Sequence, residues 1–232
     1  MPRNTTNIKK KRIKNQRISI AILAAGTGSK IRSYEPRSLL KTAEGTLLDH
    51  QIKLLNNVFD RPDIITVVGC HANRVIRRFR GRTRIVENQI FSDTNASESL
   101  RLAFNNMDNE HFMFFHGDLL FNTNAIDVDY GKSFVIIDSS GQFKDQEVGI
   151  TKINNNLSIM SYGLKEKWAQ IAYFTGKEYS ILKSIFQKFQ ESDKKQLSFE
   201  IINKIITMGG SFACYEPKGM KILEIDRIKD IQ

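Results

Sequence analysis

The chain has 232 residues, a hydrophobic content of 41% and a formal net charge of +10. This length suits one α/β domain, alone or with a small subdomain, and the hydrophobic content is sufficient for a sizeable core. No apolar run reaches membrane-spanning length and no stretch has the pattern of a secretory signal, so we expect no association with a membrane. Cys70 and Cys214 are far apart and belong to no metal-ligand pattern, which favours a reducing, cytoplasmic compartment.

The positive charge is concentrated at the N-terminus. Seven cations and no acid lie in the first 17 residues, and without them the net charge is only +3. We interpret residues 1–16 as a basic flexible arm that precedes a single domain, 17–232. The run Lys9-Lys10-Lys11-Arg12 suits a nucleic acid or another acidic partner, and equally a solvated tail.

The stretch 18–25 is an apolar run of strand length that leads into a loop of small residues. This loop is Gly26-Thr27-Gly28-Ser29, and it ends at Lys30. Glycines let backbone N–H groups approach an anion closely, and open α/β sheets bind phosphates where a buried strand ends in such a loop. The dinucleotide fingerprint is not matched, because Ile31 stands where its third glycine would be, and the P-loop pattern is absent.

Strand and helix patterns then alternate along the chain. Helices are predicted at 46–57, 72–80, 178–189 and 198–207, with another that opens after Asn95. Strands are predicted at 64–69, 84–86, 112–115, 133–138, 147–151, 157–159 and 168–174, and two final ones at 212–215 and 221–225. This alternation predicts a doubly wound, mostly parallel α/β sheet with a Rossmann-like arrangement. A small hairpin-containing subdomain is expected over about 140–175.

Two segments carry a resemblance to a known superfamily. They are Leu23-Ala24-Ala25-Gly26-Thr27-Gly28-Ser29-Lys30 and Pro36-Arg37-Ser38-Leu39. Together they resemble the signature of the MobA-like nucleotidyltransferases that couple an NTP to a sugar phosphate or an alcohol phosphate. The family pattern has arginine at the first cationic position and lysine at the second, so Lys30 and Arg37 keep both charges in exchanged form. The resemblance implies that 23–29 bind the nucleotide and that both cations act in catalysis by stabilising the triphosphate.

The stretch 87–103 is similar to the cytidylyltransferase branch of the same superfamily. It contains Asn88 and the sequence Thr94-Asn95-Ala96-Ser97, which opens a helix. The resemblance implies that Asn88, Asn95 and Ser97 help to bind the nucleotide, and it favours CTP. Taken alone, Asn95 or Ser97 is equally an ordinary helix N-cap.

Two aspartates complete the resemblance. Asp118 follows the predicted strand 112–115 in the sequence His116-Gly117-Asp118, and Asp226 follows Glu224-Ile225. The resemblance implies that both carboxylates hold one Mg²⁺, and that Asp118 is catalytic. In the reaction so implied, a phosphate oxygen of a phosphorylated small-molecule acceptor attacks the α-phosphorus of the NTP, and pyrophosphate leaves. The subdomain over about 140–175 is expected to cover this acceptor. No protein nucleophile is needed, because the acceptor phosphate is already anionic.

Two alternatives remain open at this point. In the first, the nucleotidyltransferase-like fold has lost catalysis and serves as a binding or assembly module, with the basic arm and the arginine-rich helix 72–80 contacting nucleic acid. In the second, a related fold transfers a guanylyl group to a pterin-type cofactor.

Overall fold

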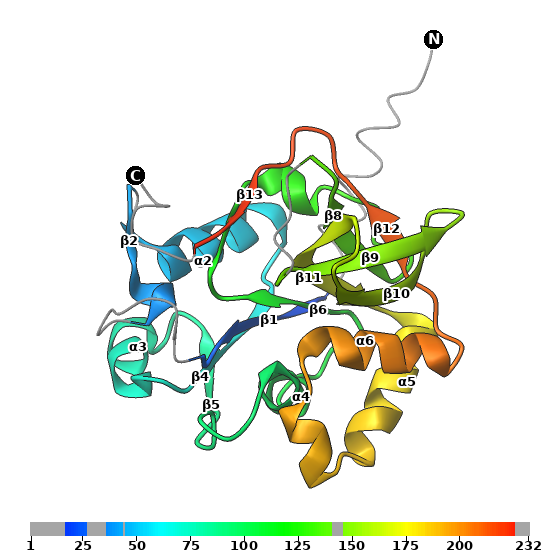
Figure 1. The fold of residues 1–232 in the computed structure, drawn as a ribbon. Coiled ribbons are helices and arrows are strands. Elements are labelled where there is room, and N and C mark those ends of the chain that lie inside the picture. Colours follow the sequence, from blue (N-terminus) through cyan, green and yellow to red (C-terminus); the bar gives the residue numbers. More distant parts are fainter. Residues whose placement is uncertain (1–16, 27–35, 44, 141–145, 226–232) are drawn as a thin grey trace.

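The computed structural model describes residues 17–26, 36–43, 45–140 and 146–225. Within these ranges, the main sheet has nine strands in the order β5-β4-β1-β6-β11-β8-β12-β10-β9 (Figure 1). Its strands are β1 (Ser19–Ala24), β4 (Asp63–Val68), β5 (Arg84–Glu87), β6 (Phe112–His116), β8 (Phe134–Asp138), β9 (Val148–Ile153), β10 (Asn156–Tyr162), β11 (Glu166–Phe174) and β12 (Ala213–Tyr215). Two small ribbons pair β2 (Lys41–Thr42) with β3 (Gly45–Thr46), and β7 (Leu119–Phe121) with β13 (Ile222–Glu224).

Eight helical segments connect these strands over the described ranges. The α-helices are α2 (Leu47–Val58), α3 (Ala72–Phe79), α4 (Ala96–Phe104), α5 (Gly176–Gln187) and α6 (Ser198–Thr207). The 3₁₀ helices are η1 (Arg37–Leu39), η2 (Thr123–Ile126) and η3 (Glu191–Lys195). Each helix predicted from sequence periodicity is present, with ends shifted by a few residues. Among the described residues, no helix is both long and apolar enough to cross a membrane.

The sheet has a parallel half and a mixed half. β5, β4, β1 and β6 are parallel, because a helix carries the chain across the sheet between successive strands. From β6 onward, β11 is antiparallel to both β6 and β8, and β9 and β10 form a hairpin. The predicted α/β class is therefore confirmed, and the parallel pairing lies mainly in the N-terminal half. The two final strands do not pair with each other, since β12 lies parallel to β8 and β13 pairs with β7.

Both faces of the sheet are covered by helices. Successive side chains of a strand point to opposite faces, and the buried residues accordingly separate into two large clusters. Ile20 and Ile22 of β1 belong to the cluster with α2 and α3, whereas Ala21 and Leu23 belong to the cluster with α4, α5 and α6. Figure 1 shows these two sets of helices on opposite sides of the sheet. The arrangement is doubly wound, as the sequence predicts.

The N-terminus of α2 is held by a network around one carboxylate. Thr46 and Asp49 form a capping box, in which Asp49 also accepts a hydrogen bond from the Thr46 hydroxyl. Arg78 on α3 and Arg82, which follows α3, both donate to Asp49. Burial alone would raise the pKa of Asp49, but the hydrogen bonds from Thr46, Arg82 and Arg78 together lower it well below its ordinary value. This network joins α2 to α3.

Candidate active site

A cavity of about 270 Å³ opens at the carboxyl ends of β1 and β6. β4 and β5 lie on one side of β1 and β6 lies on the other, so the strand order changes direction here. Open α/β sheets bind their ligands at such switch points. The lining residues are Leu23, Ala24, Ala25, Gly26, Arg37, Ser38, Asn88, Phe91, Thr94, Asn95, Ala96, Ser99, His116, Gly117 and Asp118.

Glycines let the strand ends converge on this cavity. The amide of Gly117 donates to the carbonyl of Leu23 at 2.8 Å. A Cβ at Gly117 would lie 2.8 Å from the Cβ of Ala24, and a Cβ at Gly69 would lie 2.7 Å from the carbonyl oxygen of Ala25. Side chains at these two positions would push the backbone after β4 and β6 away from the end of β1.

An ion pair between Arg37 and Asp118 forms part of the cavity wall. Arg37, at the start of η1, donates from Nη1 to Oδ2 of Asp118 at 2.5 Å. The two side chains are only 17% and 16% exposed. The other carboxylate oxygen, Oδ1 of Asp118, is buried and has no hydrogen-bond partner among the described residues. A buried carboxylate oxygen without a partner is costly, and a cation or a donor on a ligand would satisfy it.

The backbone of the C-terminal strand passes directly beside Asp118. The amide of Ile225 donates to the carbonyl oxygen of Asp118 at 2.8 Å, just after β13 pairs with β7. The predicted second metal ligand, Asp226, is the next residue in the chain and lies outside the described residues. The same holds for the predicted nucleotide-loop residues Thr27, Gly28, Ser29 and Lys30, and for the basic arm 1–16.

Asn88 lines the cavity just after β5. Its Nδ2 donates to Thr94 Oγ1 at 3.1 Å and to Ser99 Oγ at 3.2 Å. Thr94 uses its own hydroxyl proton on the carbonyl of Ile90, so its oxygen accepts from Asn88 and the orientation of the amide is determined. The Oδ1 atom of Asn88 is buried and has no hydrogen-bond partner among the described residues. The side chain therefore offers an unused acceptor.

Asn95 and Ser97 occupy different environments. Asn95 lines the cavity, and its Nδ2 donates to the carbonyl of Lys195 at 2.6 Å. Ser97 is fully buried, is not among the cavity-lining residues, and donates to the carbonyl of Asp193 at 2.7 Å. Its hydroxyl joins α4 to η3, so this geometry gives no support to the nucleotide-binding role that the resemblance implies for Ser97. The physical reason is that the first turn of α4 packs directly against η3.

His116 forms another part of the wall. Its Nε2 lies 3.0 Å from Ser198 Oγ at the start of α6. Burial lowers the pKa of His116, Asp118 opposes this shift, and the charge of Arg37 adds to it. The imidazole is therefore neutral near pH 7, as expected for a strand-end residue that packs rather than one that carries charge.

Several lining residues were not among the predicted site residues, although four of them lie within the quoted motifs; they are Ser38, Phe91, Thr94, Ala96, Ser99 and Gly117. Ala96 and Ser99 are three positions apart on α4 and share one face of the helix, so helical periodicity counted from the predicted N-terminus would have indicated both. Phe91 has no comparable signal, because it reaches the cavity through the irregular chain between β5 and α4.

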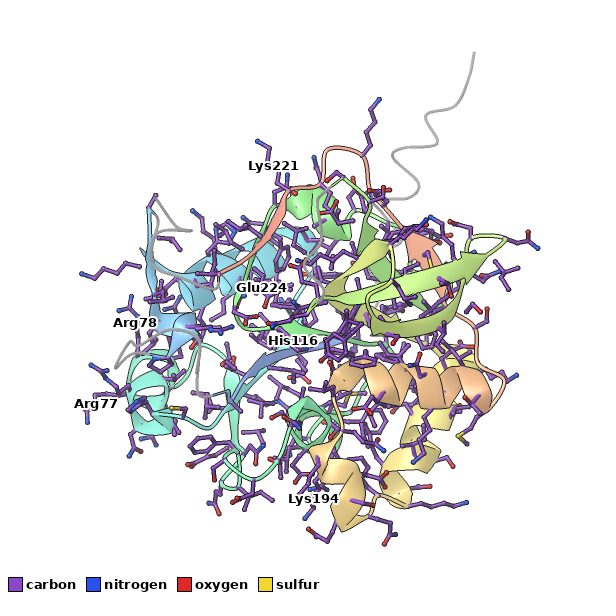
Figure 2. The ribbon with its side chains drawn as sticks, viewed as in Figure 1. Arg77, Arg78, His116, Lys194, Lys221 and Glu224 are labelled. Atoms are coloured by element: carbon purple, nitrogen blue, oxygen red, sulfur yellow. The ribbon has the colours of Figure 1, made fainter. Side chains whose placement is uncertain are left out.

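A group of polar side chains surrounds Glu224, which pairs in register with Leu119, the residue after Asp118. Glu224 on β13 accepts from Nε2 of Gln170 at 2.6 Å, and Nζ of Lys167 lies 4.0 Å from the same carboxylate. Gln170 has a φ of +58°, a left-handed conformation that is strained for a residue other than glycine. Figure 2 shows Glu224 and His116 near the middle of the molecule, whereas Arg77 and Arg78 lie on its outer edge on α3.

Solved structures show the same fold over nearly the whole chain. The CTP:phosphocholine cytidylyltransferase of Streptococcus pneumoniae is 20% identical, with a TM-score of 0.77 over 92% of this chain and 96% of that one. The inositol-1-phosphate CTP transferase of T. maritima is 18% identical, with a TM-score of 0.73 over 94% and 92%. At these identities the likeness establishes the fold, which is that of the nucleotidyltransferases.

Sequence comparison adds matches that the solved structures do not give, and the family match lies in the N-terminal half. Residues 20–128 match the model of the MobA-like NTP transferase domain, a stretch that ends shortly after Asp118. The bifunctional protein GlmU of Koribacter versatilis is 38% identical over 61 residues, which span 26% of this chain and 13% of that relative. The match over 20–128 agrees with the resemblance to the MobA-like nucleotidyltransferases that the sequence motifs carry.

Proposed function

We propose that this protein is a Mg²⁺-dependent nucleotidyltransferase that joins an NTP, preferably CTP, to a phosphorylated sugar or alcohol and releases pyrophosphate. The observation that carries the proposal is the cavity at the β1/β6 switch point. It brings together the backbone of 23–26, the cation Arg37, the carboxylate Asp118 and the amide Asn88. These are an anion cradle, a charge to stabilise phosphate, a metal ligand and a group for the base.

Backbone and amide groups support the binding of the nucleotide. The chain leaves β1 through Ala25 and Gly26 at the cavity wall, where small side chains leave the backbone accessible to phosphate oxygens. The unused acceptor Oδ1 of Asn88 supports the preference for CTP, because the exocyclic amino group of cytosine is a hydrogen-bond donor and the corresponding uracil oxygen is not. Asn95 at the same wall is available to support the sugar or the base.

The donor atoms at Asp118 fit a hard divalent cation. Mg²⁺ prefers carboxylate oxygens, and Oδ1 of Asp118 is a buried carboxylate oxygen without a partner among the described residues. Asp226 directly follows Ile225, whose amide binds the carbonyl of Asp118, and this proximity supports Asp226 as the second ligand. When bound, Mg²⁺ supplies positive charge that lowers the cost of charge developing on the phosphates.

Arg37 and Lys30 act as the cations of the reaction in this proposal. The planar guanidinium of Arg37 is held at the cavity wall by Asp118, so its charge faces the ligand without reorganisation. The acceptor phosphate oxygen attacks the α-phosphorus, the bond from that phosphorus to the bridging oxygen breaks, and pyrophosphate carries away the electron pair. No side chain of the protein has to remove a proton. The polar group around Glu224, together with the hairpin of β9 and β10, is the proposed acceptor side.

Substitution of Asp118 tests the proposal. Asp118→Asn keeps the shape of the side chain but removes its charge, so we expect pyrophosphate release from CTP to fall by about 10²–10³-fold. Release is measured with Mg²⁺ and a panel of acceptors that contains choline phosphate, inositol 1-phosphate and glucose 1-phosphate. Asp93→Asn, at an exposed carboxylate outside the cavity lining, is the matched control. Normal turnover by Asp118→Asn, or equal losses in both variants, would contradict the assignment.

A further inference from the structure

We propose that Gln51 is the positioning residue of Asp118, an inference that rests on the proposed function because Asp118 is the proposed metal ligand. Gln51 lies on α2 and is fully buried. It does not line the cavity and no sequence motif includes it. Its side chain acts on the metal site through the backbone on either side of Asp118.

One amide nitrogen binds two carbonyls. Nε2 of Gln51 donates to the carbonyl of Leu119 at 2.7 Å and, with a longer bond, to the carbonyl of Gly117 at 3.3 Å. A side-chain amide nitrogen carries two hydrogens, so both donors are used. The orientation of the amide is determined, because its two neighbours are carbonyl oxygens that can only accept. Gln51 therefore bridges the carbonyls of the two residues that flank Asp118.

The segment 117–119 is anchored from three elements. Its amide at Gly117 binds Leu23 of β1, and its carbonyl at Asp118 accepts from Ile225 after β13. With Gln51 of α2, each of the three successive carbonyls accepts a hydrogen bond. The backbone so held, together with the ion pair to Arg37, sets the direction of the Asp118 side chain. Of the three backbone anchors only Gln51 uses a side chain.

Gln51 is itself placed on a rigid element. The N-terminus of α2 has the capping box of Thr46 and Asp49, and His50 lies with its Nε2 2.9 Å from the carbonyl of Phe121 at the end of β7. Ile52, the next residue, packs into the core. Oε1 of Gln51 is buried without a hydrogen-bond partner among the described residues, a cost that an apolar side chain would avoid. The hydrogen bonds from Nε2 to the two carbonyls offset that cost.

Gln51→Met tests this inference, because methionine has a similar length and no donor. Ile52→Val is the matched control, because Ile52 is the next residue on α2 and this change lowers stability without removing a hydrogen bond to 117–119. Mn²⁺ binding is followed by electron paramagnetic resonance, and the thermal midpoints of both variants are recorded. We expect Gln51→Met to weaken Mn²⁺ binding by about 10–100-fold while Ile52→Val stays near the wild type. We also expect faster amide hydrogen exchange in the peptide that contains 117–121 for Gln51→Met alone.

The Mg²⁺ dependence of pyrophosphate release separates positioning from general loss of stability. The Mg²⁺ concentration for half-maximal release should rise in Gln51→Met, while the KM for CTP changes little. Gln51→Asn, which keeps the amide but shortens its reach, replaces Gln51→Met if the latter does not fold. Equal Mn²⁺ affinity in wild type and Gln51 variants would overturn the positioning role alone. A wild type that binds no Mn²⁺ would overturn the proposed metal site, and the positioning role with it.

Discussion

Replacement of Gly117 by alanine tests whether the close approach of β1 and β6 builds the cavity. A Cβ at this position would lie 2.8 Å from the Cβ of Ala24 and 3.1 Å from both the Cα of Ala24 and the carbonyl oxygen of Leu23. Two of these three atoms belong to the backbone of the central strand, which cannot move away as a flexible side chain would. Overpacking of this kind costs about 1–3 kcal/mol.

The conformational entropy of the unfolded chain changes the stability in the opposite direction. A change from glycine to alanine stabilises a protein by about 0.4–1 kcal/mol through the entropy of the unfolded chain. Gly26→Ala is the matched control, because it lies on the same cavity and a Cβ there meets nothing within 4 Å among the described residues. Since the unfolded-state contribution is common to both variants, their free energies of unfolding should differ by about 1–3 kcal/mol, with Gly117→Ala the less stable.

Urea denaturation at neutral pH measures this difference, and the thermal midpoint should change by about 2–4 °C per kcal/mol. Gly117→Ala should also lose pyrophosphate release, because the alanine displaces the segment that carries Asp118. Equal stability of the two variants, within about 0.5 kcal/mol, would refute the argument that the strand ends are packed too closely for a Cβ at 117.

Three further predictions follow from buried polar groups. Ser97→Ala should lower the free energy of unfolding by about 0.5–1.5 kcal/mol, because it removes one buried hydrogen bond while the carbonyl of Asp193 still accepts from the amide of Gln196. The KM for CTP should stay unchanged, and a large change in that KM would show that Ser97 does contact the base. The pKa of Asp49 is lowered in the folded state, so its contribution to stability is present above its ordinary pKa of 3.8 and is lost as the pH falls below that value. In urea denaturation, the stability difference between wild type and Asp49→Asn should therefore shrink below pH 4. A difference that stays constant with pH would contradict this prediction. Burial raises the pKa of the Cys214 thiol to about 11, so at pH 8 a thiol reagent should modify the partly exposed Cys70 first and Cys214 only after unfolding.

Periodicity and motif order predicted much of the fold. The apolar run before Gly26, the β-branched strand at 64–69 and the amphipathic stretches of the five helices all appear where the patterns place them. They are local properties: the side-chain period of 2.0 or 3.6 residues decides the element, and the strand–helix alternation decides the parallel crossovers. The position of Asp118 at a strand end was readable for the same reason.

Tertiary structure decided which residues contact one another at the site. Ser97 and Asn95 stand two residues apart in one motif, yet the packing of α4 against η3 buries the first and leaves the second on the cavity wall. Gln51 has no local signal at all, because its bridge to the carbonyls of 117 and 119 exists only once α2 lies against β7.

The amino-acid sequence by itself determined the order of the elements, the glycine-rich exit from the first strand and the residue types that phosphate and metal chemistry require. The tertiary structure alone decided which of those residues meet and which atoms are left without partners. The physical reason is the separation along the chain of the residues that interact. Propensity and periodicity act between residues a few positions apart, whereas the hydrogen bonds that hold the backbone around Asp118 come from residues 51, 23 and 225, which only the folded sheet brings to the same point.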